Sequence, residues 1–384
     1  MRTSKLPEIG TTIFTVMSRR ARELGALNLG QGFPDYDIDP ELAAQVAAAM
    51  RAGHNQYAPM EGLPLLRAAI AAKLAASYGV RVDPEADVTI TQGATEAIYS
   101  AIQAAVGAGD EVIAFDPAYD SYEPAVRLAG ARCVRLPLTQ PGFRYDWERV
   151  RATVNARTRL ILLNSPHNPA CTVATRADLD ELAAAIRDRD ILVLADEVYE
   201  HVVFDGGRHY SVLGHPELAA RSFAVFSFGK TLHATGLRVG YCVAPPALTA
   251  ELRKVHQFNT FSIAHPLQHA IAAYLAARPD LGQELAGFFQ AKRDRLRAAL
   301  APCGFRLPPA EGTYFQLLDF SEFAPADDLQ FAERLLTEAG VASIPLSPFY
   351  AERTPLTFLR LCIAKRDATL DAAAARLSAF AARL

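Results

Sequence analysis

Short apolar runs alternate with longer alanine- and leucine-rich stretches through the middle of the chain. Several short runs are apolar at consecutive positions, which is typical of strands covered by helices on both faces. The longer stretches between them end at glycine or at a charged turn, as helices do. The pattern predicts helices at residues 94–109 and 176–189, and strands at residues 87–92, 111–117, 132–138, 159–166, 191–197, 222–228 and 238–244. This alternation indicates an α/β domain with a mainly parallel sheet.

The pattern changes at two points along the chain. The predicted strands at 222–228 and 238–244 are separated by too little chain for a crossover helix, so we expect them to be antiparallel. Beyond residue 264 a long helical region precedes predicted strands at 312–320 and 358–364. This region indicates a smaller α+β domain that the N-terminal segment completes. We place the large domain at residues 41–283 and the small domain at residues 1–40 and 284–384.

Composition excludes several classes of protein. The chain has 384 residues, of which 51% are hydrophobic, and a net charge of -3, so a large core is available and a nucleic-acid partner is not expected. The start lacks the apolar region of an export signal, and no apolar stretch approaches the length of a membrane span. The five cysteines are scattered without C-x-x-C spacing. We therefore expect a cytoplasmic protein with reduced thiols, no membrane segment and no metal site.

Polar residues follow the predicted strands at their carboxyl ends, where open parallel sheets bind ligands. In chain order they are Gly93, Ala94, Thr95, Tyr119, the loop from Asn164 to Pro169, Asp196, Tyr199, Ser227 and Lys230. Small residues directly before a helix, as in TQGATEA, suit a phosphate, although an ordinary strand-to-helix turn has the same composition.

Two charged residues of this set each have a structural and a chemical interpretation. Lys230 could extend its ammonium to water from a packed stem, or it could be a reactive amine whose pKa is lowered by burial or by a nearby cation. Asp196 ends an apolar strand, so it either meets a cation or caps the following helix.

Seven motifs together resemble those of the fold-type I pyridoxal phosphate enzymes, the aspartate aminotransferase superfamily. They are TQGATEA, FDPAY, NSPHNP, ADEVY, SFGK, TGLRVGY and, much later, FLRLCIA, and they cover essentially the whole chain. Four further stretches look most like bacterial methionine aminotransferases, whose relatives are the kynurenine and glutamine transaminases: LNLGQGFPDYD, NQYAPMEGLPLLR, GKTLHATG and IPLSPFY. The resemblance implies a large domain with a mixed, mainly parallel seven-stranded sheet plus a smaller α+β domain.

The resemblance also implies pyridoxal 5'-phosphate as cofactor and a role for each residue around it. Lys230 would form a Schiff base with the cofactor and then move the proton, which makes it tether and acid/base in turn. Asp196 would pair with the pyridine nitrogen, and Tyr199 and Asn168 would donate to the ring hydroxyl oxygen. Tyr119 would stack on the ring.

The phosphate and the substrate have implied ligands of their own. For the phosphate they are the amides of Gly93 and Ala94 with Thr95 beside them, Ser227, Arg238, and Tyr57 from a second subunit of a homodimer. Arg360 would bind the substrate α-carboxylate near the Gly32 backbone, although a surface arginine at a strand end is the interpretation from the residues alone. Phe14 and Phe261 would line the side-chain pocket.

The implied reaction moves an amino group from methionine or another large apolar or aromatic amino acid to a 2-oxo acid. A carbon–sulfur β-lyase, a kynurenine or glutamine transaminase and a non-catalytic cofactor-binding regulator remain alternatives.

Several neighbouring residues have a structural interpretation. His167 and His233 could relay protons or be structural, Phe33 could line the side-chain pocket or pack in the core, and Tyr314 could simply pack in the small domain. The chain departs from the family pattern at Pro169-Ala170-Cys171, where proline-threonine-glycine is usual, and at Leu237, where tryptophan is frequent.

Overall fold

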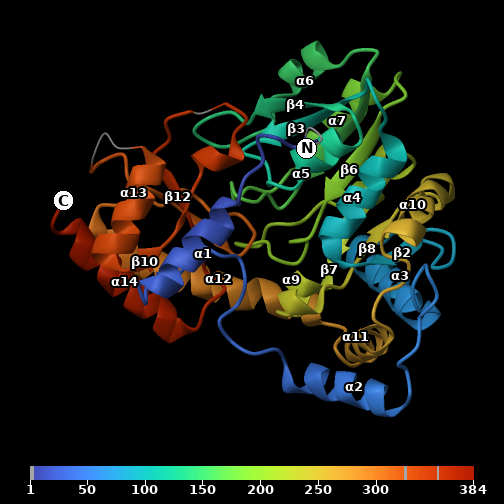
Figure 1. Cartoon of the computed structure of the whole chain (residues 1–384), viewed down its shortest axis with the longest axis horizontal. Helices are drawn as coiled ribbons and strands as arrows, with labels where there is room; N and C mark the ends of the chain where they lie inside the picture. The colour runs from blue at the N-terminus through green and yellow to red at the C-terminus, as the bar shows by residue number, and fades with distance from the viewer. Residues whose placement is uncertain (1–3, 324–326, 353) are drawn as a thin grey trace.

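The computed structural model describes residues 4–323, 327–352 and 354–384 and contains one large sheet and two small ones (Figure 1). All seven strands predicted for the large sheet are present, with ends within two residues of the predicted ones. They are β2 (Val88–Thr91), β3 (Glu111–Asp116), β4 (Arg132–Pro137), β5 (Thr158–Asn164), β6 (Leu192–Asp196), β7 (Ser222–Ser227) and β8 (Gly240–Val243).

The strand order in the large sheet is β2-β8-β7-β6-β5-β3-β4. Strand β8 is antiparallel to both of its neighbours, with Cys242 opposite Val225 on β7 and Tyr241 opposite Ile90 on β2. The pairs β3–β4, β3–β5, β5–β6 and β6–β7 are parallel. The expected antiparallel neighbour and the mainly parallel sheet are therefore both confirmed.

Helices cover both faces of this sheet, which explains its continuous apolar strands. Because side chains alternate along a strand, Val112 and Ala114 of β3 pack on one side and Ile113 and Phe115 on the other. The first side is covered by α4 (Gly93–Ala105), α5 (Tyr122–Leu128) and α10 (Pro246–Asn259). The second is covered by α3 (Pro64–Tyr78), α6 (Trp147–Thr153), α7 (Arg176–Ile186) and α11 (His265–Ala277).

The two helices predicted from the sequence are α4 and α7, and both end earlier than expected. Helix α7 begins at a capping box in which Thr175 and Asp178 satisfy each other's backbone N–H groups. The remaining helices of this part of the chain are α2 (Pro40–Arg51), α8 (Pro216–Ala219) and α9 (Phe228–Thr231).

The N-terminal segment pairs with the C-terminal part of the chain. Strand β1 (Leu27–Asn28) pairs in parallel with β10 (Val341–Ala342), and α1 (Ile13–Glu23) lies beside them, blue against red in Figure 1. A second small sheet has the antiparallel order β11-β12-β9, with strands β9 (Phe315–Asp319), β11 (Ile344–Pro345) and β12 (Phe358–Cys362). The helices here are α12 (Leu281–Leu300), α13 (Asp328–Arg334) and α14 (Asp367–Ala381).

None of the helices within the described residues combines the length and apolar character that a membrane span needs. All five cysteines are free thiols.

Candidate active site

A cavity of about 140 Å³ opens at the carboxyl ends of the large sheet. Strands β5, β6 and β7 end there, and α4 begins there. The residues predicted from the sequence that line it are Ala94, Thr95, Tyr119, Asn168, Asp196, Tyr199, Ser227, Lys230 and Arg238. Ile98, Asn164, Val198, Gly229 and Thr235 complete the lining. Asn164 begins a loop that the sequence had already indicated, and Thr235 is one of the polar residues near Lys230 in the sequence, whereas Ile98, Val198 and Gly229 were not predicted.

Lys230 lies in the single-turn helix α9, directly after β7. Its Nζ is 5.5 Å from the ring centre of Tyr314 and 5.7 Å from that of Tyr199. Burial opposes the charge, but Tyr314 and Tyr119 more than offset it and raise the pKa of Lys230. The expectation of a lowered pKa is therefore wrong for the protein by itself, because electron-rich phenol rings surround the ammonium rather than a second cation.

Asp196 is buried at the end of β6 and is 5% exposed. Its Oδ2 accepts a hydrogen bond of 2.5 Å from the Tyr122 hydroxyl, and its Oδ1 accepts from the Val198 N–H at 3.3 Å. Burial raises the pKa of Asp196 to about 6, and these donors with Lys230 limit the rise. Both interpretations of this residue hold in part, since it caps a turn and also stands in a cavity as a carboxylate that binds a proton unusually well.

Tyr122 was not anticipated, because its position in α5 carries no signal that distinguishes it from a core aromatic. Its hydroxyl orients the Asp196 carboxylate.

Arg360 of β12 is only 1% exposed, so the interpretation as a surface arginine is wrong. Its Nη1 donates to Asn168 Oδ1 at 2.6 Å and its Nη2 donates to the Gly30 carbonyl at 2.9 Å. The buried Nε finds no partner among the described residues. Its guanidinium carbon lies 3.9 Å from the Phe315 ring centre and 5.0 Å from that of Phe14. A buried, partly unpaired guanidinium is well suited to bind a carboxylate.

Asn168 connects this arginine to the rim of the large sheet. Its backbone N–H donates to Asn164 Oδ1 at 2.9 Å, and Asn164 Nδ2 donates to the Asp196 carbonyl, also at 2.9 Å. The chain of hydrogen bonds from Asp196 to Arg360 fixes the separation between the two charged groups.

Tyr314, from the segment before β9, lies beside two residues that line the cavity, Tyr199 and Lys230. Its hydroxyl donates to the Gly32 carbonyl at 2.6 Å, and its ring meets that of Tyr199 edge to face, with centres 4.9 Å apart. The proposal that Tyr314 only packs in the small domain is therefore wrong. Burial raises the pKa of Tyr199 well above its ordinary value, so this phenol keeps its proton and can donate a hydrogen bond.

The turn before α4 forms a cradle for an anion. Gly93 has a φ of +69°, and a Cβ at this position would lie 2.9 Å from Nη2 of Arg238. The first N–H groups of α4 have no partner within the helix, as in any helix, so they can donate to an anion bound at this turn. Arg238 also has a positive φ, of 55°, and its Nη1 donates to the Thr235 carbonyl at 3.2 Å.

The other predicted residues, Arg360 among them, are not part of the lining of this cavity. Tyr57 is 81% exposed and Phe261 is 45% exposed, and their rings meet edge to face with centres 5.3 Å apart. Gly32 lies against the Phe315 ring, and Phe14 packs on Phe349. Phe33 is 39% exposed, so its assignment to the core is wrong.

Two histidines and one loop near the site were uncertain from the sequence. Burial lowers the pKa of His167 to about 3 and that of His233 to about 4, so both are neutral at ordinary pH. Cys171, at the position where the family usually has glycine, keeps a positive φ of 63° and donates its N–H to the His167 carbonyl at 2.8 Å. The loop therefore retains a left-handed turn without the glycine.

Comparison with known proteins identifies the family. A family model described as aminotransferase class I and II matches residues 25–377. The chain belongs to the class I and II aminotransferases. This aminotransferase is 51% identical over 374 residues to the methionine aminotransferase of Escherichia coli (strain K12), a match that covers 97% of each chain. A solved structure from Escherichia coli, whose reactivity identified a methionine aminotransferase function, has a TM-score of 0.97 and 50% identity over 99% of each chain.

Two further relatives come from other branches of the family. N-succinyldiaminopimelate aminotransferase from Mycobacterium tuberculosis has a TM-score of 0.95 and 38% identity, and the match covers 99% of this aminotransferase and 100% of that chain. Kynurenine–oxoglutarate transaminase 1 of Mus musculus is 33% identical over 395 residues, 94% of this chain and 93% of that one. The expected family and its fold-type I architecture are confirmed.

Proposed function

We propose that this aminotransferase binds pyridoxal 5'-phosphate in the cavity around Lys230 and takes its amino group from methionine or another large apolar or aromatic amino acid. A 2-oxo acid would accept the group. The observation that carries the choice of donor is the 51% identity, over nearly the whole chain, to a methionine aminotransferase. The aromatic rings of Phe14 and Phe315 beside Arg360 support it, since they surround the carboxylate-binding arginine with apolar surface.

The cavity has the donors that this cofactor requires. The amides of Gly93 and Ala94, with Thr95, Ser227 and Arg238, would hold the phosphate at the start of α4. Each charge-assisted hydrogen bond of this kind contributes about 1.5–3 kcal/mol.

The ring of the cofactor would lie between these phosphate donors and the end of β6. The buried Asp196 carboxylate suits a protonated ring nitrogen, Tyr199 and Asn168 suit the ring hydroxyl oxygen, and Tyr119 offers an aromatic face. Tyr57 would reach the phosphate of a second subunit.

The bound cofactor supplies an electron sink, and the residues of the chain place the substrate and move its proton. Arg360 binds the α-carboxylate through its fork and so orients the α-carbon. Lys230 Nζ would accept the proton from that carbon and then donate it to a different atom. The amine must be neutral when it accepts the proton. The Asp196 carboxylate would place a negative charge beside the ring nitrogen of the cofactor. The hydrogen bond from the Tyr122 hydroxyl holds this carboxylate in its orientation.

The test is a comparison of kcat/KM among four donors: methionine, phenylalanine, kynurenine and aspartate, each with the same 2-oxo acid. We expect at least one of the large apolar or aromatic donors to exceed aspartate by about 100-fold, a discrimination that a difference of one methylene in an apolar pocket can already approach. A value for aspartate above those of the other three would refute the proposed donor class. Release of pyruvate and ammonia from cystathionine without any oxo acid would instead indicate the β-lyase.

We also propose a homodimer, two domains and a cytoplasmic location. The exposed pair Tyr57 and Phe261 is the support for the dimer, because both side chains would be covered at the partner's site. The pairing of β1 with β10 supports a small domain of residues 1–40 and 284–384 beside a large domain of 41–283, although α12 runs as one helix across the limit. Five free thiols suit a reducing compartment.

A further inference from the structure

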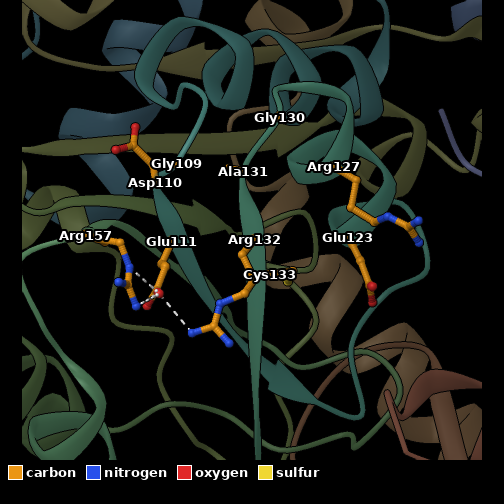
Figure 2. A pocket seen from close by; sticks show the side chains of 10 residues that line it. All are labelled: Gly109, Asp110, Glu111, Glu123, Arg127, Gly130, Ala131, Arg132, Cys133 and Arg157. Atoms are coloured by element: carbon orange, nitrogen blue, oxygen red, sulfur yellow. Dashed lines mark hydrogen bonds and ion pairs between the residues drawn. The ribbon is translucent and has the colours of Figure 1, made fainter.

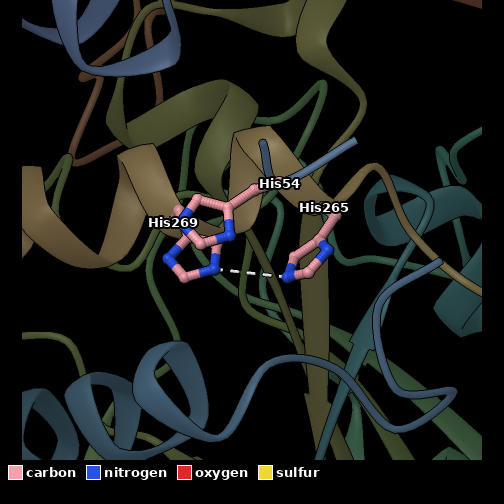
Figure 3. Close-up of side chains that lie close together, drawn as sticks. All are labelled: His54, His265 and His269. Atoms are coloured by element: carbon pink, nitrogen blue, oxygen red, sulfur yellow. Dashed lines mark hydrogen bonds between the residues drawn. The ribbon is translucent and has the colours of Figure 1, made fainter. Parts of the chain in front are cut away.

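Three histidines from distant parts of the sequence meet outside the active site (Figure 3). His265 and His269 lie one turn apart on α11, so their side chains share a face of the helix. His54 comes from the loop after α2, a helix that packs against α11. All three side chains are half-buried, and one nitrogen of each lies within 4.8 Å of those of the other two.

The backbone holds His54 in place at the end of α2. Gly53 has a φ of +90° and donates to the Met50 carbonyl at 3.2 Å, and His54 donates to the Ala49 carbonyl at the same distance. This pair of bonds is a Schellman motif, which ends a helix in one defined direction. The direction of His54 toward α11 is therefore a property of the fold and not of a freely moving loop.

The distances inside this histidine cluster match those between metal ligands. The Nε2 atoms of His265 and His269 are 3.2 Å apart. Two nitrogens bound to one tetrahedral zinc at 2.0–2.1 Å are about 3.3 Å apart. The rings of His54 and His269 are stacked, with centres 3.6 Å apart, and a nitrogen of His54 lies within 4.8 Å of the other two ligand atoms.

A hydrogen bond fixes which nitrogen of His265 is free. Its Nδ1 is 3.1 Å from the Gln56 carbonyl oxygen, which can only accept, so Nδ1 carries the proton. Nε2 of His265 therefore carries no proton and accepts the hydrogen bond from His269 Nε2, whose proton would move to Nδ1 when a metal ion takes its place. This is the arrangement in which proteins hold a ligating histidine, with the second ring nitrogen bound to a carbonyl or carboxylate.

The donor atoms of the cluster indicate the kind of metal it would bind. Among the described residues, the hydrogen-bond partners of these rings are the Gln56 carbonyl and one another. Three imidazole nitrogen donors suit Zn²⁺, Co²⁺, Ni²⁺ or Cu²⁺ rather than Mg²⁺ or Ca²⁺, which take oxygen ligands.

We propose that His54, His265 and His269 form a binding site for one divalent first-row transition metal ion, with zinc as the reference case. The fourth position of the tetrahedron is open to water. The ion ties the loop after α2 to the first turns of α11, and the same loop carries Gln56 and the exposed Tyr57. The site is separate from Lys230 and needs no step of amino transfer, so its role is structural or regulatory.

The test is a metal titration of the purified protein without a polyhistidine tag, after treatment with a chelator and dialysis. Co²⁺ is added first, because its visible d–d bands report the coordination, and Zn²⁺ binding is then measured by calorimetry. The variants are His54→Gln and His269→Gln. The control is His215→Asn, since His215 lies outside the cluster and accepts from the Leu218 N–H at the start of α8, a cap that asparagine can replace.

We expect one ion per chain in the wild type and in the control, and an affinity at least about 100-fold lower in each cluster variant, since even outer partners of ligands are worth 10–100-fold. Circular dichroism that matches the wild type establishes that the variants are folded. Three results would overturn the proposal: no stoichiometric binding by the wild type, unchanged binding in both cluster variants, or the charge-transfer bands of cysteine ligation. None of these three results depends on whether methionine is the amino-group donor of the reaction.

Discussion

The two ends of the large sheet each carry a polar hollow, and they differ in how their charges are paired. At the amino ends of β3 and β4, a hollow of about 500 Å³ is lined by Glu111, Glu123, Arg127, Arg132 and Arg157, among others (Figure 2). Glu111 Oε1 contacts Arg132 at 2.8 Å and Arg157 at 2.7 Å, and Oε2 accepts from Asn155 at 2.9 Å. These donors lower the pKa of Glu111 to about 2.

The smaller cavity at the carboxyl ends has the opposite balance. Asp196 shares its hydrogen bond with a neutral phenol, and burial raises its pKa to about 6. Arg360, which donates to the lining residue Asn168, is buried, and its Nε has no partner among the described residues. Charges that satisfy each other stabilise the fold, whereas buried charges left without a counter-ion favour a charged ligand. The pairing of charges therefore distinguishes the active site better than the size of the hollow does.

Removal of a cation should have very different effects at the two ends. Lys230→Ala takes away the amine that we propose as the proton carrier, so we expect kcat to fall by about 10⁴-fold or more. Arg157→Ala, at the amino-end hollow, should leave kcat within about twofold of the wild type. The measurement is steady-state transamination with methionine, with cofactor content and circular dichroism as controls. Comparable losses in the two variants would contradict the assignment of the site.

A conservative exchange of arginine for lysine should show the same contrast. Arg360→Lys keeps the charge and loses the planar fork, so we expect kcat/KM to fall by roughly 10³-fold, mainly through KM. Arg132→Lys, which is largely exposed beside Glu111, should change neither parameter by more than about twofold. An unchanged KM for methionine in Arg360→Lys would show that the carboxylate binds elsewhere.

Arg360 also shows what the sequence could and could not predict. Apolar runs determine strands that are buried on both faces, so all seven strands of the large sheet and the antiparallel β8 were predictable. The burial of Arg360 depends on Phe14, Phe315 and Phe349, which lie far apart in the sequence and meet only after folding. Without the family resemblance, no local pattern separates this arginine from a surface one.

Contacts between segments that are remote in the sequence also explain the other features that were not predicted. Tyr122 and Tyr314 enter the site through hydrogen bonds and ring contacts to residues that are remote in the chain. The raised pKa of Lys230 depends on phenol rings from two other segments. The histidine cluster was not expected, because two of its members alone form a helical pair and the third is more than 200 residues away.

Neutralising Asp196 should stabilise the cofactor-free protein. The folded pKa of about 6 lies above the ordinary 3.8, so the folded state holds the proton more tightly than the unfolded state does. Stability is therefore lost as pH rises between these values, and above pH 6 the loss is complete, at roughly 3 kcal/mol. Asp196→Asn should recover up to that amount at pH 8 and little at pH 4. Urea unfolding of the cofactor-free wild type and variant at pH 4 and pH 8 measures this difference in stability. A variant that is less stable than the wild type at pH 8 would contradict the prediction.

The matching substitution at the other end of the sheet, Glu111→Gln, should lower the free energy of unfolding at neutral pH, whereas Asp196→Asn should raise it. The folded pKa of about 2 lies below the ordinary 4.5, so this carboxylate adds stability above about pH 4.5 and loses it as pH falls toward 2. Arg132 and Arg157 are 66% and 65% exposed, so solvent screens the pairs and we expect a loss of only about 1–2 kcal/mol at pH 7. Urea unfolding again measures it, with unchanged kcat for methionine as the control. A gain of stability in both neutralised variants at neutral pH would mean that burial outweighs pairing at Glu111, and a loss in both would mean that Asp196 is also stabilised by its partners. Either result would show that the pairing of charges does not distinguish the site.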